Sequence, residues 1–337
     1  MPEFAALLRR ALGGENLSQD DVASFVGEIM DGNYTPSQAA GLLVALAAKG
    51  ETVDEIVGAA RAMRERSLHV EHGLPTVVDV VGTGGDHANT LNISTMAALV
   101  VATTGIPVAK HGNRAASSAC GSADVLEAAG LPIEIAPEAA AAMLQSCNFT
   151  FMFAPRYHPA MRNAAAIRRE LGIRTIFNLL GPLTNPAGAT HLVVGVPRPE
   201  LVERIGEALR ALGARRGAVV HGLSGVDEVV GDAPSLIYAF DEEGASLRRV
   251  EPSDFGIEPT PTPVGGSIEA SHQAFTEILR GAPGSAADVV ALNAAVVFYA
   301  IGAERSLASA FERARALLAS GDAWPTFERA REFARRG

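Results

Sequence analysis

The sequence has few cysteines, and this excludes a protein held together by disulfides. Only two cysteines, Cys120 and Cys147, occur among 337 residues. They are too few for a disulfide framework and too far apart in sequence for a C-x-x-C metal or redox pair. We therefore expect both to be reduced thiols.

Long apolar runs are also missing. The most apolar stretch, residues 39–48, is far shorter than the roughly 18 consecutive residues that indicate a membrane span. Near the N-terminus, Glu3 precedes the apolar residues 4–8 and Arg9 and Arg10 follow them, which reverses the charge order of a secretory signal. We expect a cytoplasmic protein with no membrane partner.

Positive charge is scarce, since the formal net charge is -10. Binding to a nucleic-acid backbone needs a basic surface, so we expect no nucleic-acid partner. The same long-range field repels any anionic substrate. Such a substrate would need local cations and N–H donors, together with a metal ion, to overcome that background.

The chain contains 48% apolar residues, enough at this length for two hydrophobic cores. The first 70 residues read as helices, because three helix starts are marked by capping residues. These are Ser18 with Asp21, Thr35 ahead of a proline, and Thr52 with Glu55. Domain 1–70 is therefore predicted to be small and all-helical.

From residue 76 the pattern changes to short β-branched runs, turns and alanine-rich helices. This alternation predicts an α/β domain over 71–337 with a mainly parallel central sheet flanked by helices. Residues 251–267 are rich in proline and glycine and are predicted to form a loop. The candidate strands are residues 77–81, 107–109, 149–153, 191–196 and 218–221.

The first candidate strand runs into a glycine-rich turn, Gly82-Thr83-Gly84-Gly85-Asp86, and Asn92-Ile93-Ser94-Thr95 then precedes an apolar helix. Glycines allow several N–H groups to converge on a phosphate near a helix N-terminus. The alternative is an ordinary tight turn that binds nothing. The turn matches neither the dinucleotide fingerprint nor the Walker A motif, which counts against a dinucleotide or an ATP-type site.

The second candidate strand ends in Lys110-His111-Gly112-Asn113-Arg114, and three serines follow at 117, 118 and 122. Two cations and three hydroxyls near one sheet edge suit a doubly charged leaving group. Taken singly, the cations are equally consistent with solvated charges, His111 with a packed histidine, and the serines with helix caps.

Two further groups carry potential chemistry. Asp227 and Glu228 are adjacent hard-oxygen donors of the kind that Mg²⁺ accepts beside phosphates, although an acidic pair on a loop is usually only solvated. Arg168, which follows His158 in the chain, either clamps a carboxylate or pairs near Glu170 on a helix surface.

In their order and spacing, the motifs GTGGD, NIST, KHGNR, SS, GSAD, HP, RRELGIRTIFNLLGPLTNP and the late DE pair resemble the anthranilate phosphoribosyltransferases of tryptophan biosynthesis. The resemblance covers nearly the whole chain and is densest over residues 78–228. It implies a small helical domain, which also forms a homodimer, beside a larger α/β domain. It further implies that part of 159–190 returns to the helical domain.

The resemblance assigns most of the motif residues to substrates. The predicted substrate-binding residues, for phosphoribosyl pyrophosphate and anthranilate together, are Gly82, Gly85, Asp86, Thr90, Asn92, Ile93, Ser94, Thr95, Lys110, His111, Gly112, Asn113, Arg114, Ala115, Ala116, Ser117, Ser118, Ser122, His158 and Arg168. Among them Gly82, Asn113 and Arg168 would contact anthranilate, with His111 and His158 lining its channel.

The implied reaction is attack of the anthranilate amine on C1 of the ribose, with loss of pyrophosphate. Lys110, Arg114 and Arg168 are the predicted catalytic residues. Two Mg²⁺ ions per subunit are expected, with Ser94, Asp227 and Glu228 as ligands. The resemblance also names an amidotransferase subunit of anthranilate synthase as a candidate partner.

The sequence departs from the family's usual residues at His87, Leu91, Cys120 and Ser224. None of these four positions has an assigned phosphate, metal or carboxylate contact. Two alternatives were weighed. One is a pyrimidine nucleoside phosphorylase, which shares this architecture, and the other is a non-catalytic paralogue of the same fold that binds nucleic acid.

Overall fold

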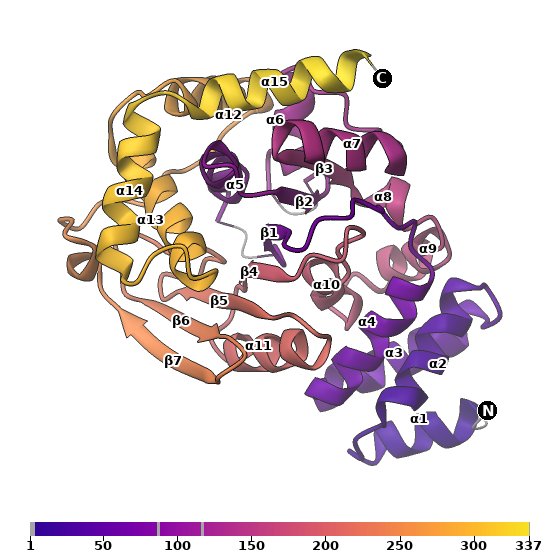
Figure 1. Ribbon diagram of the computed structural model, residues 1–337. Coiled ribbons are helices and arrows are strands. Elements are labelled where there is room, and N and C mark those ends of the chain that lie inside the picture. The colour runs from indigo at the N-terminus through magenta and orange to yellow at the C-terminus, as the bar shows by residue number, and fades with distance from the viewer. Residues whose placement is uncertain (1–3, 86–87, 116–117, 337) are drawn as a thin grey trace.

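The computed structural model describes residues 4–85, 88–115 and 118–336 and centres on a seven-stranded sheet (Figure 1). The strand order is β3-β2-β1-β4-β5-β6-β7, with the first five strands parallel and the last two antiparallel. A mainly parallel sheet is thus confirmed. The strands are β1 (Val78–Gly82), β2 (Val108–Gly112), β3 (Phe149–Phe153), β4 (His191–Gly195), β5 (Arg216–Gly222), β6 (Ser235–Phe240) and β7 (Ala245–Val250).

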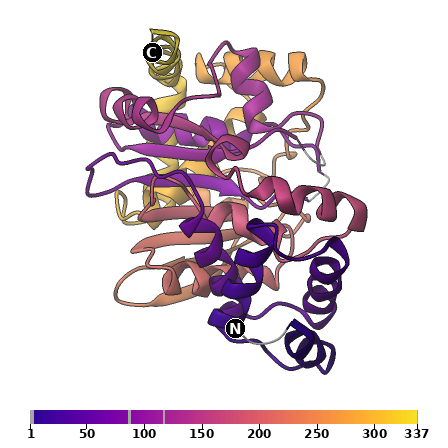
Figure 2. The same ribbon diagram turned by 90° about the vertical axis from the view of Figure 1, so that its right-hand side faces the viewer.

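Four helices form the N-terminal part: α1 (Phe4–Leu12), α2 (Gln19–Met30), α3 (Pro36–Lys49) and α4 (Val53–Glu65). All three predicted caps are confirmed, because the side chains of Ser18, Thr35 and Thr52 each accept the N–H of the residue three positions on. Such a cap contributes about 1 kcal/mol to helix stability. Figure 2 shows these indigo helices at the end of the molecule opposite the yellow C-terminal helices.

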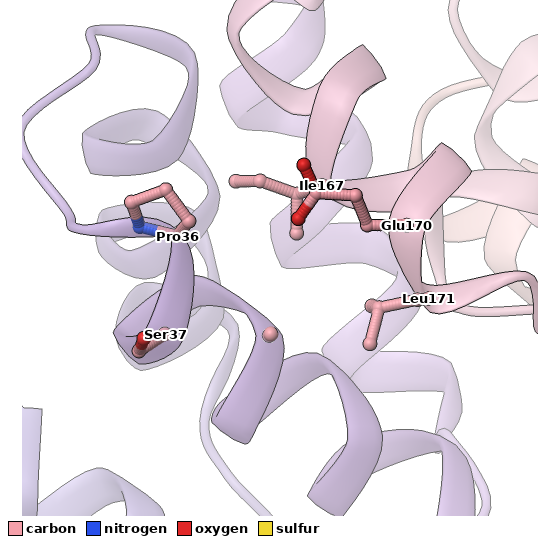
Figure 3. Close-up of a pocket in the computed structure, with 6 residues that line it drawn as sticks. Pro36, Ser37, Ile167, Glu170 and Leu171 are labelled. Atoms are coloured by element: carbon pink, nitrogen blue, oxygen red, sulfur yellow. The ribbon is translucent and has the colours of Figure 1, made fainter.

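Helix α9 (Met161–Leu171) packs against α2 and α3 although it is far from them in sequence. A hollow of about 190 Å³ lies between α3 and α9. Figure 3 shows the residues that line it. Ile167, Glu170 and Leu171 line it from α9, while Pro36, Ser37 and Ala40 line it from α3. The boundary at residue 70, with its return over part of 159–190, stays a prediction.

Helices cover both faces of the sheet. In Figure 1, α5 (Ile93–Thr103) and α13 (Ser285–Ala300) lie on one side of the row of strands, and α10 (Phe177–Leu180) and α11 (Leu201–Ala211) lie on the other. Among the described residues no helix has the length and apolarity needed to cross a membrane. The remaining helices are α6 (Ser122–Ala128), α7 (Pro137–Cys147), α8 (Ala154–Tyr157), α12 (Ile268–Leu279), α14 (Leu307–Ala319) and α15 (Ala323–Arg336), with 3-10 turns η1 (Gly181–Leu183) and η2 (Pro252–Phe255).

The strand order reverses at β1, which lies between β2 and β4. In open α/β sheets, ligands bind outside the carboxyl ends of strands at such a point. The glycine-rich turn begins at the carboxyl end of β1. The structure adds β6 and β7, which were not predicted, and β2 continues through Lys110 and His111, whose backbone pairs in register with Phe151 and Met152 of β3.

Candidate active site

The glycine-rich turn after β1 is held by residues distant in sequence. The N–H of Thr83 donates to the carbonyl of Gly195 at 2.9 Å, and the N–H of Gly84 donates to Oδ2 of Asp227 at 2.9 Å. A Cβ at Gly82 would overlap the Asp227 carboxylate. The turn and the acidic loop are therefore one structure, and glycine is required at 82 for the close approach.

The first turn of α5 forms the next wall of the site. Ser94 and Asn92 stay partly accessible, whereas the side chains of Ile93 and Thr95 are fully buried. The N–H of Ile93 donates to the Leu91 carbonyl at 2.7 Å and that of Thr95 to the Asn92 carbonyl at 3.1 Å, so the binding roles of these two residues stay predictions. Thr90 pairs with Val264 in an isolated antiparallel bridge. The predicted binding residue Asp86, and His87 beside it, lie outside the described residues.

Lys110 points into the sheet edge and is not a solvated surface charge. Its side chain is 1% exposed, and Nζ donates to the Val80 carbonyl at 2.5 Å and to Oγ of Ser94 at 3.2 Å. Burial lowers the pKa of Lys110 to about 8, while the carboxylates of Asp79, Glu228 and Asp227 oppose that shift. A cation therefore lies beside the Ser94 hydroxyl, near both acidic residues of the late loop.

Asp79 is a site residue that the sequence interpretation missed. It is fully buried within β1, where Oδ1 accepts the N–H of His111 at 3.2 Å and Oδ2 accepts Nδ2 of Asn185 at 2.7 Å. Burial raises the pKa of Asp79 to about 6, against the opposing effect of Lys110. A carboxylate inside an apolar strand was the available signal, since Asp is rarely buried without partners.

The loop after β2 is organised around Asp124, whose Oδ2 accepts the N–H groups of Ala115 and Gly121, each at 2.9 Å. Although partial burial raises the pKa of Asp124, these N–H groups and Arg114 hold it below its ordinary value. Oγ of Ser122 donates to the Asn113 carbonyl at 3.2 Å. Of the other predicted loop residues, Gly112 ends β2, Ser118 is half-buried, and Ala116 and Ser117 lie outside the described residues.

Arg114 is paired within its own loop. Its guanidinium forms ion pairs with Asp124 at 2.9 Å and Glu127 at 2.8 Å and lies 5.6 Å from the ring centroid of Phe153. These pairs, led by the hydrogen bonds that Arg114 donates to Glu127, raise the pKa of Arg114. Its predicted catalytic role stays a prediction, and it requires that the exposed guanidinium exchange these carboxylates for pyrophosphate.

His111 and His158 form a buried pair of neutral rings. Their ring centroids are 5.0 Å apart, and Nδ1 of His111 donates to the Gly181 carbonyl at 3.0 Å. Burial lowers the pKa of His111 to about 4 and that of His158, with a smaller contribution from His111, to about 3. We refer to these two neutral, nearly fully buried rings as the His111–His158 wall.

Two arginines approach the site from the segment after β3. Arg168 on α9 places its guanidinium 5.8 Å from the ring centroid of Phe177, and burial lowers its pKa. Arg174, which the sequence interpretation did not single out, donates Nη1 to the Gly84 carbonyl at 3.1 Å. Arg174 belongs to the quoted motif RRELGIRTIFNLLGPLTNP, but the motif does not predict its contact, which spans 90 residues.

The donor chemistry of the site fits Mg²⁺. Asp227, Glu228 and Ser94 offer hard oxygens, and all three lie in the neighbourhood of Lys110. Within residues 4–85, 88–115 and 118–336, no group of three or more His, Cys, Asp or Glu side chains is arranged to hold a metal. A metal here would draw its other ligands from hydroxyls, water or a bound phosphate. Both cysteines are free, as predicted, and both are buried.

The structure thus combines a helical bundle with a mainly parallel sheet, which carries a glycine-rich turn and a buried lysine near its switch point. The α/β domain model of the glycosyl transferase family matches residues 74–324, and its helical bundle domain model matches residues 5–67. The chain belongs to this family and, within it, to the anthranilate phosphoribosyltransferases.

Full-length relatives support the narrower assignment. The chain is 44% identical over 333 residues to the anthranilate phosphoribosyltransferase of Symbiobacterium thermophilum, covering 98% of each. It is 48% identical over 313 residues to that of Herpetosiphon aurantiacus, covering 91% of this chain and 92% of the relative.

Solved structures agree. The anthranilate phosphoribosyltransferase of Thermus thermophilus superimposes with a TM-score of 0.92 at 44% identity, covering 98% of this chain and 99% of that one. The Saccharomyces cerevisiae enzyme, in complex with PRPP and Mg, superimposes with a TM-score of 0.90 at 25% identity, covering 99% and 98%.

Proposed function

We propose that this protein transfers the phosphoribosyl group of 5-phosphoribosyl 1-pyrophosphate to the amine of anthranilate, releasing pyrophosphate. The observation that carries this proposal is the contact between the Gly84 N–H and Asp227, which joins an anion-binding turn to a metal-suited acidic loop across 143 residues. The family relationship supplies the identity of the two substrates.

The donor side would bind the pyrophosphate and ribose phosphate through the glycine turn, the start of α5 and the loop at 113–122. Lys110 would stabilise the negative charge that develops on the departing pyrophosphate. Arg114 would supply a second cation once its guanidinium no longer pairs with Glu127. Mg²⁺, held by Ser94, Asp227 and Glu228, would neutralise pyrophosphate charge when bound. Stabilisation of developing charge by groups already in place is usually the largest catalytic contribution.

The acceptor side would hold anthranilate against the neutral His111–His158 wall. Arg168 would pair with the carboxylate of anthranilate, since a guanidinium can bind a carboxylate through two parallel hydrogen bonds. Gly82 and Asn113 would complete the contacts. An arylamine is neutral at pH 7, so its attack on C1 needs orientation rather than a strong base.

The assembly is a separate part of the proposal. We expect a homodimer formed through the helical domain, and the exposed apolar side chains of Leu12 and Val44 on that part of the chain are consistent with a contact there. Light scattering coupled to size exclusion would test the dimer. The amidotransferase subunit and the number of Mg²⁺ ions also stay predictions.

The function is tested by following the loss of anthranilate fluorescence after addition of phosphoribosyl pyrophosphate, with and without Mg²⁺. We expect a loss that requires all three components and the protein. Absence of any loss with all of them present would contradict the proposal.

A further inference from the structure

Arg64 lies in the last turn of α4, and its guanidinium leaves the helical bundle to bind two carbonyls of the α/β domain. Nε donates to the Leu183 carbonyl at 2.7 Å, and Nη1 donates to the Leu212 carbonyl at 3.0 Å. Figure 1 shows α4 beside α10, and α4 packs against both α10 and α11. One side chain therefore joins the bundle to the turn at residues 181–186 and to the end of α11.

The charge on Arg64 has an unusual environment. It is largely enclosed, and burial lowers the pKa of the guanidinium from its ordinary value, although it stays protonated. In the described part of the chain no carboxylate forms an ion pair with it, so backbone carbonyls alone compensate its charge. A buried cation is destabilising unless it is hydrogen-bonded, so these two carbonyls are what makes the enclosed charge tolerable.

The turn at residues 181–186 is bound both by Arg64 and by His111 of the His111–His158 wall. Strand residues hold both ends of this turn. Nδ1 of His111 on β2 donates to the Gly181 carbonyl, and Asp79 on β1 accepts Nδ2 of Asn185. Its middle, at Leu183, is fixed by Arg64 from the bundle. The turn directly follows α10, whose Phe177 lies beneath the Arg168 guanidinium.

We propose that Arg64 is a positioning residue for the aromatic acid substrate. It sets the middle of the turn at 181–186 and thereby the spacing between the His111–His158 wall and Arg168. The pyrophosphate side is held by other contacts, Gly84 with Asp227 and Lys110 with Ser94, which do not include Arg64. Loss of Arg64 therefore weakens the binding of anthranilate and spares that of phosphoribosyl pyrophosphate. This role rests on the proposed function.

The experiment compares Arg64→Met and Arg64→Lys with Arg66→Met. Arg66 is a matched control on the same helix end, because its guanidinium pairs with Asp31 inside the bundle, at 2.8 and 2.6 Å. KM is measured separately for each substrate by anthranilate fluorescence, and folding is checked by thermal unfolding. We expect Arg64→Met to raise KM for anthranilate about tenfold, as loss of about 1.4 kcal/mol predicts, with KM for phosphoribosyl pyrophosphate unchanged.

Arg64→Lys keeps one donor, so a smaller rise in KM for anthranilate is expected. Arg66→Met should leave both KM values within about twofold of wild type, which corresponds to less than about 0.5 kcal/mol. An unchanged KM for anthranilate in a folded Arg64 variant, or an equal rise in both KM values, would overturn the role. If Arg64→Met does not fold, Arg64→Lys decides by the same criterion. An inactive wild-type protein would instead refute the proposed function.

Discussion

Single residues of this protein are constrained by close approach and by burial more than by surface charge. Gly82 has no room for a side chain because the Asp227 carboxylate occupies that space. Lys110, His111 and Asp79 are polar groups enclosed within the sheet edge, and each has specific partners there. Their ionisation is therefore set by desolvation first and by neighbouring charge second.

Gly82→Ala should reduce kcat/KM by about 100-fold, because the added methyl group displaces Asp227, and a shift of about 1 Å at a reacting centre has an effect of that size. Gly244→Ala is the matched control, since a Cβ at Gly244 meets open space. Steady-state kinetics at saturating Mg²⁺ provide the measurement. A Gly82→Ala protein as active as Gly244→Ala would show that the turn tolerates displacement of Asp227.

The buried histidines should make stability depend on pH. The pKa of His158 is about 3 in the folded protein and about 6.5 when solvated, so the unfolded chain binds the extra proton between these values. Its stabilising contribution is present above pH 6.5 and is lost as the pH falls toward 3. The slope is about 1.4 kcal/mol per pH unit.

His158→Phe should remove that slope, as measured by urea unfolding midpoints between about pH 4 and pH 7, the range in which the unfolded histidine titrates. The pKa of Asp79 is raised to about 6, so stability from this group falls as pH rises. The difference between variant and wild type isolates the histidine from this opposite effect. Identical pH dependence in the two proteins would mean that the pKa of His158 is the same in the folded and the unfolded chain.

At the scale of elements, α9 connects the two halves of the molecule. Ile167, Glu170 and Leu171 face α3, while Arg168, one residue round the helix, lies over Phe177 of α10. Glu170 and Leu171 lie three and four residues after Ile167 and share its helix face, and Arg168, three residues before Leu171, lies at the edge of that face. One helix thus packs on the bundle and presents an arginine to the acceptor side.

Arg168→Lys should raise KM for anthranilate by roughly 10- to 100-fold, about the 1.4–2.7 kcal/mol that loss of a two-point contact with a carboxylate costs. KM for phosphoribosyl pyrophosphate should change little. Arg169→Lys, an exposed arginine on the same helix, is the control and should match wild type. If both variants bind anthranilate like wild type, Arg168 does not hold the carboxylate.

Much of the element pattern was predictable from sequence, because local rules decide it. The caps at Ser18, Thr35 and Thr52 and the five parallel strands follow from spacing and from β-branched runs. The hairpin of β6 and β7 was not predicted. β7 (Ala245–Val250) is mostly exposed and carries two arginines, so it lacks the apolar alternation that marks a strand.

The site was predictable where a motif carries it and not where a tertiary contact does. Lys110 and His111 were expected just beyond the strand at 107–109, yet they lie within β2, because buried polar residues interrupt the apolar pattern by which a strand is predicted. Asp79, Arg64 and Arg174 act on residues about 30 to 150 positions away. The spacing of these residues along the sequence does not predict which distant residues they contact.

At the scale of the whole molecule, the chain and its proposed substrates carry net negative charge, and the fold has to overcome their repulsion. The net charge of -10 opposes binding of these substrates. The site offers Lys110, N–H groups and an acidic loop suited to hold a metal ion, each of which would favour an anion locally. Local groups outweigh the long-range field because salt screens charges beyond about 8–10 Å. We therefore expect turnover to depend on Mg²⁺.

The double variant Asp227→Ala and Glu228→Ala should lose most Mg²⁺-dependent turnover, because the acidic loop would no longer hold the ion beside pyrophosphate. Initial rates across a Mg²⁺ titration provide the measurement. Asp241→Ala with Glu242→Ala, an adjacent acidic pair after β6, is the charge-matched control and should titrate like wild type. An unchanged Mg²⁺ response in the first variant would refute the role of these carboxylates.

The central claim is transfer of phosphoribose to anthranilate with pyrophosphate as the leaving group. It is tested most directly by quantifying anthranilate consumed, N-(5-phosphoribosyl)anthranilate formed by mass spectrometry, and pyrophosphate released in one reaction. The account predicts one of each per turnover. Unconsumed anthranilate, or cleavage of a pyrimidine nucleoside by inorganic phosphate instead, would contradict it.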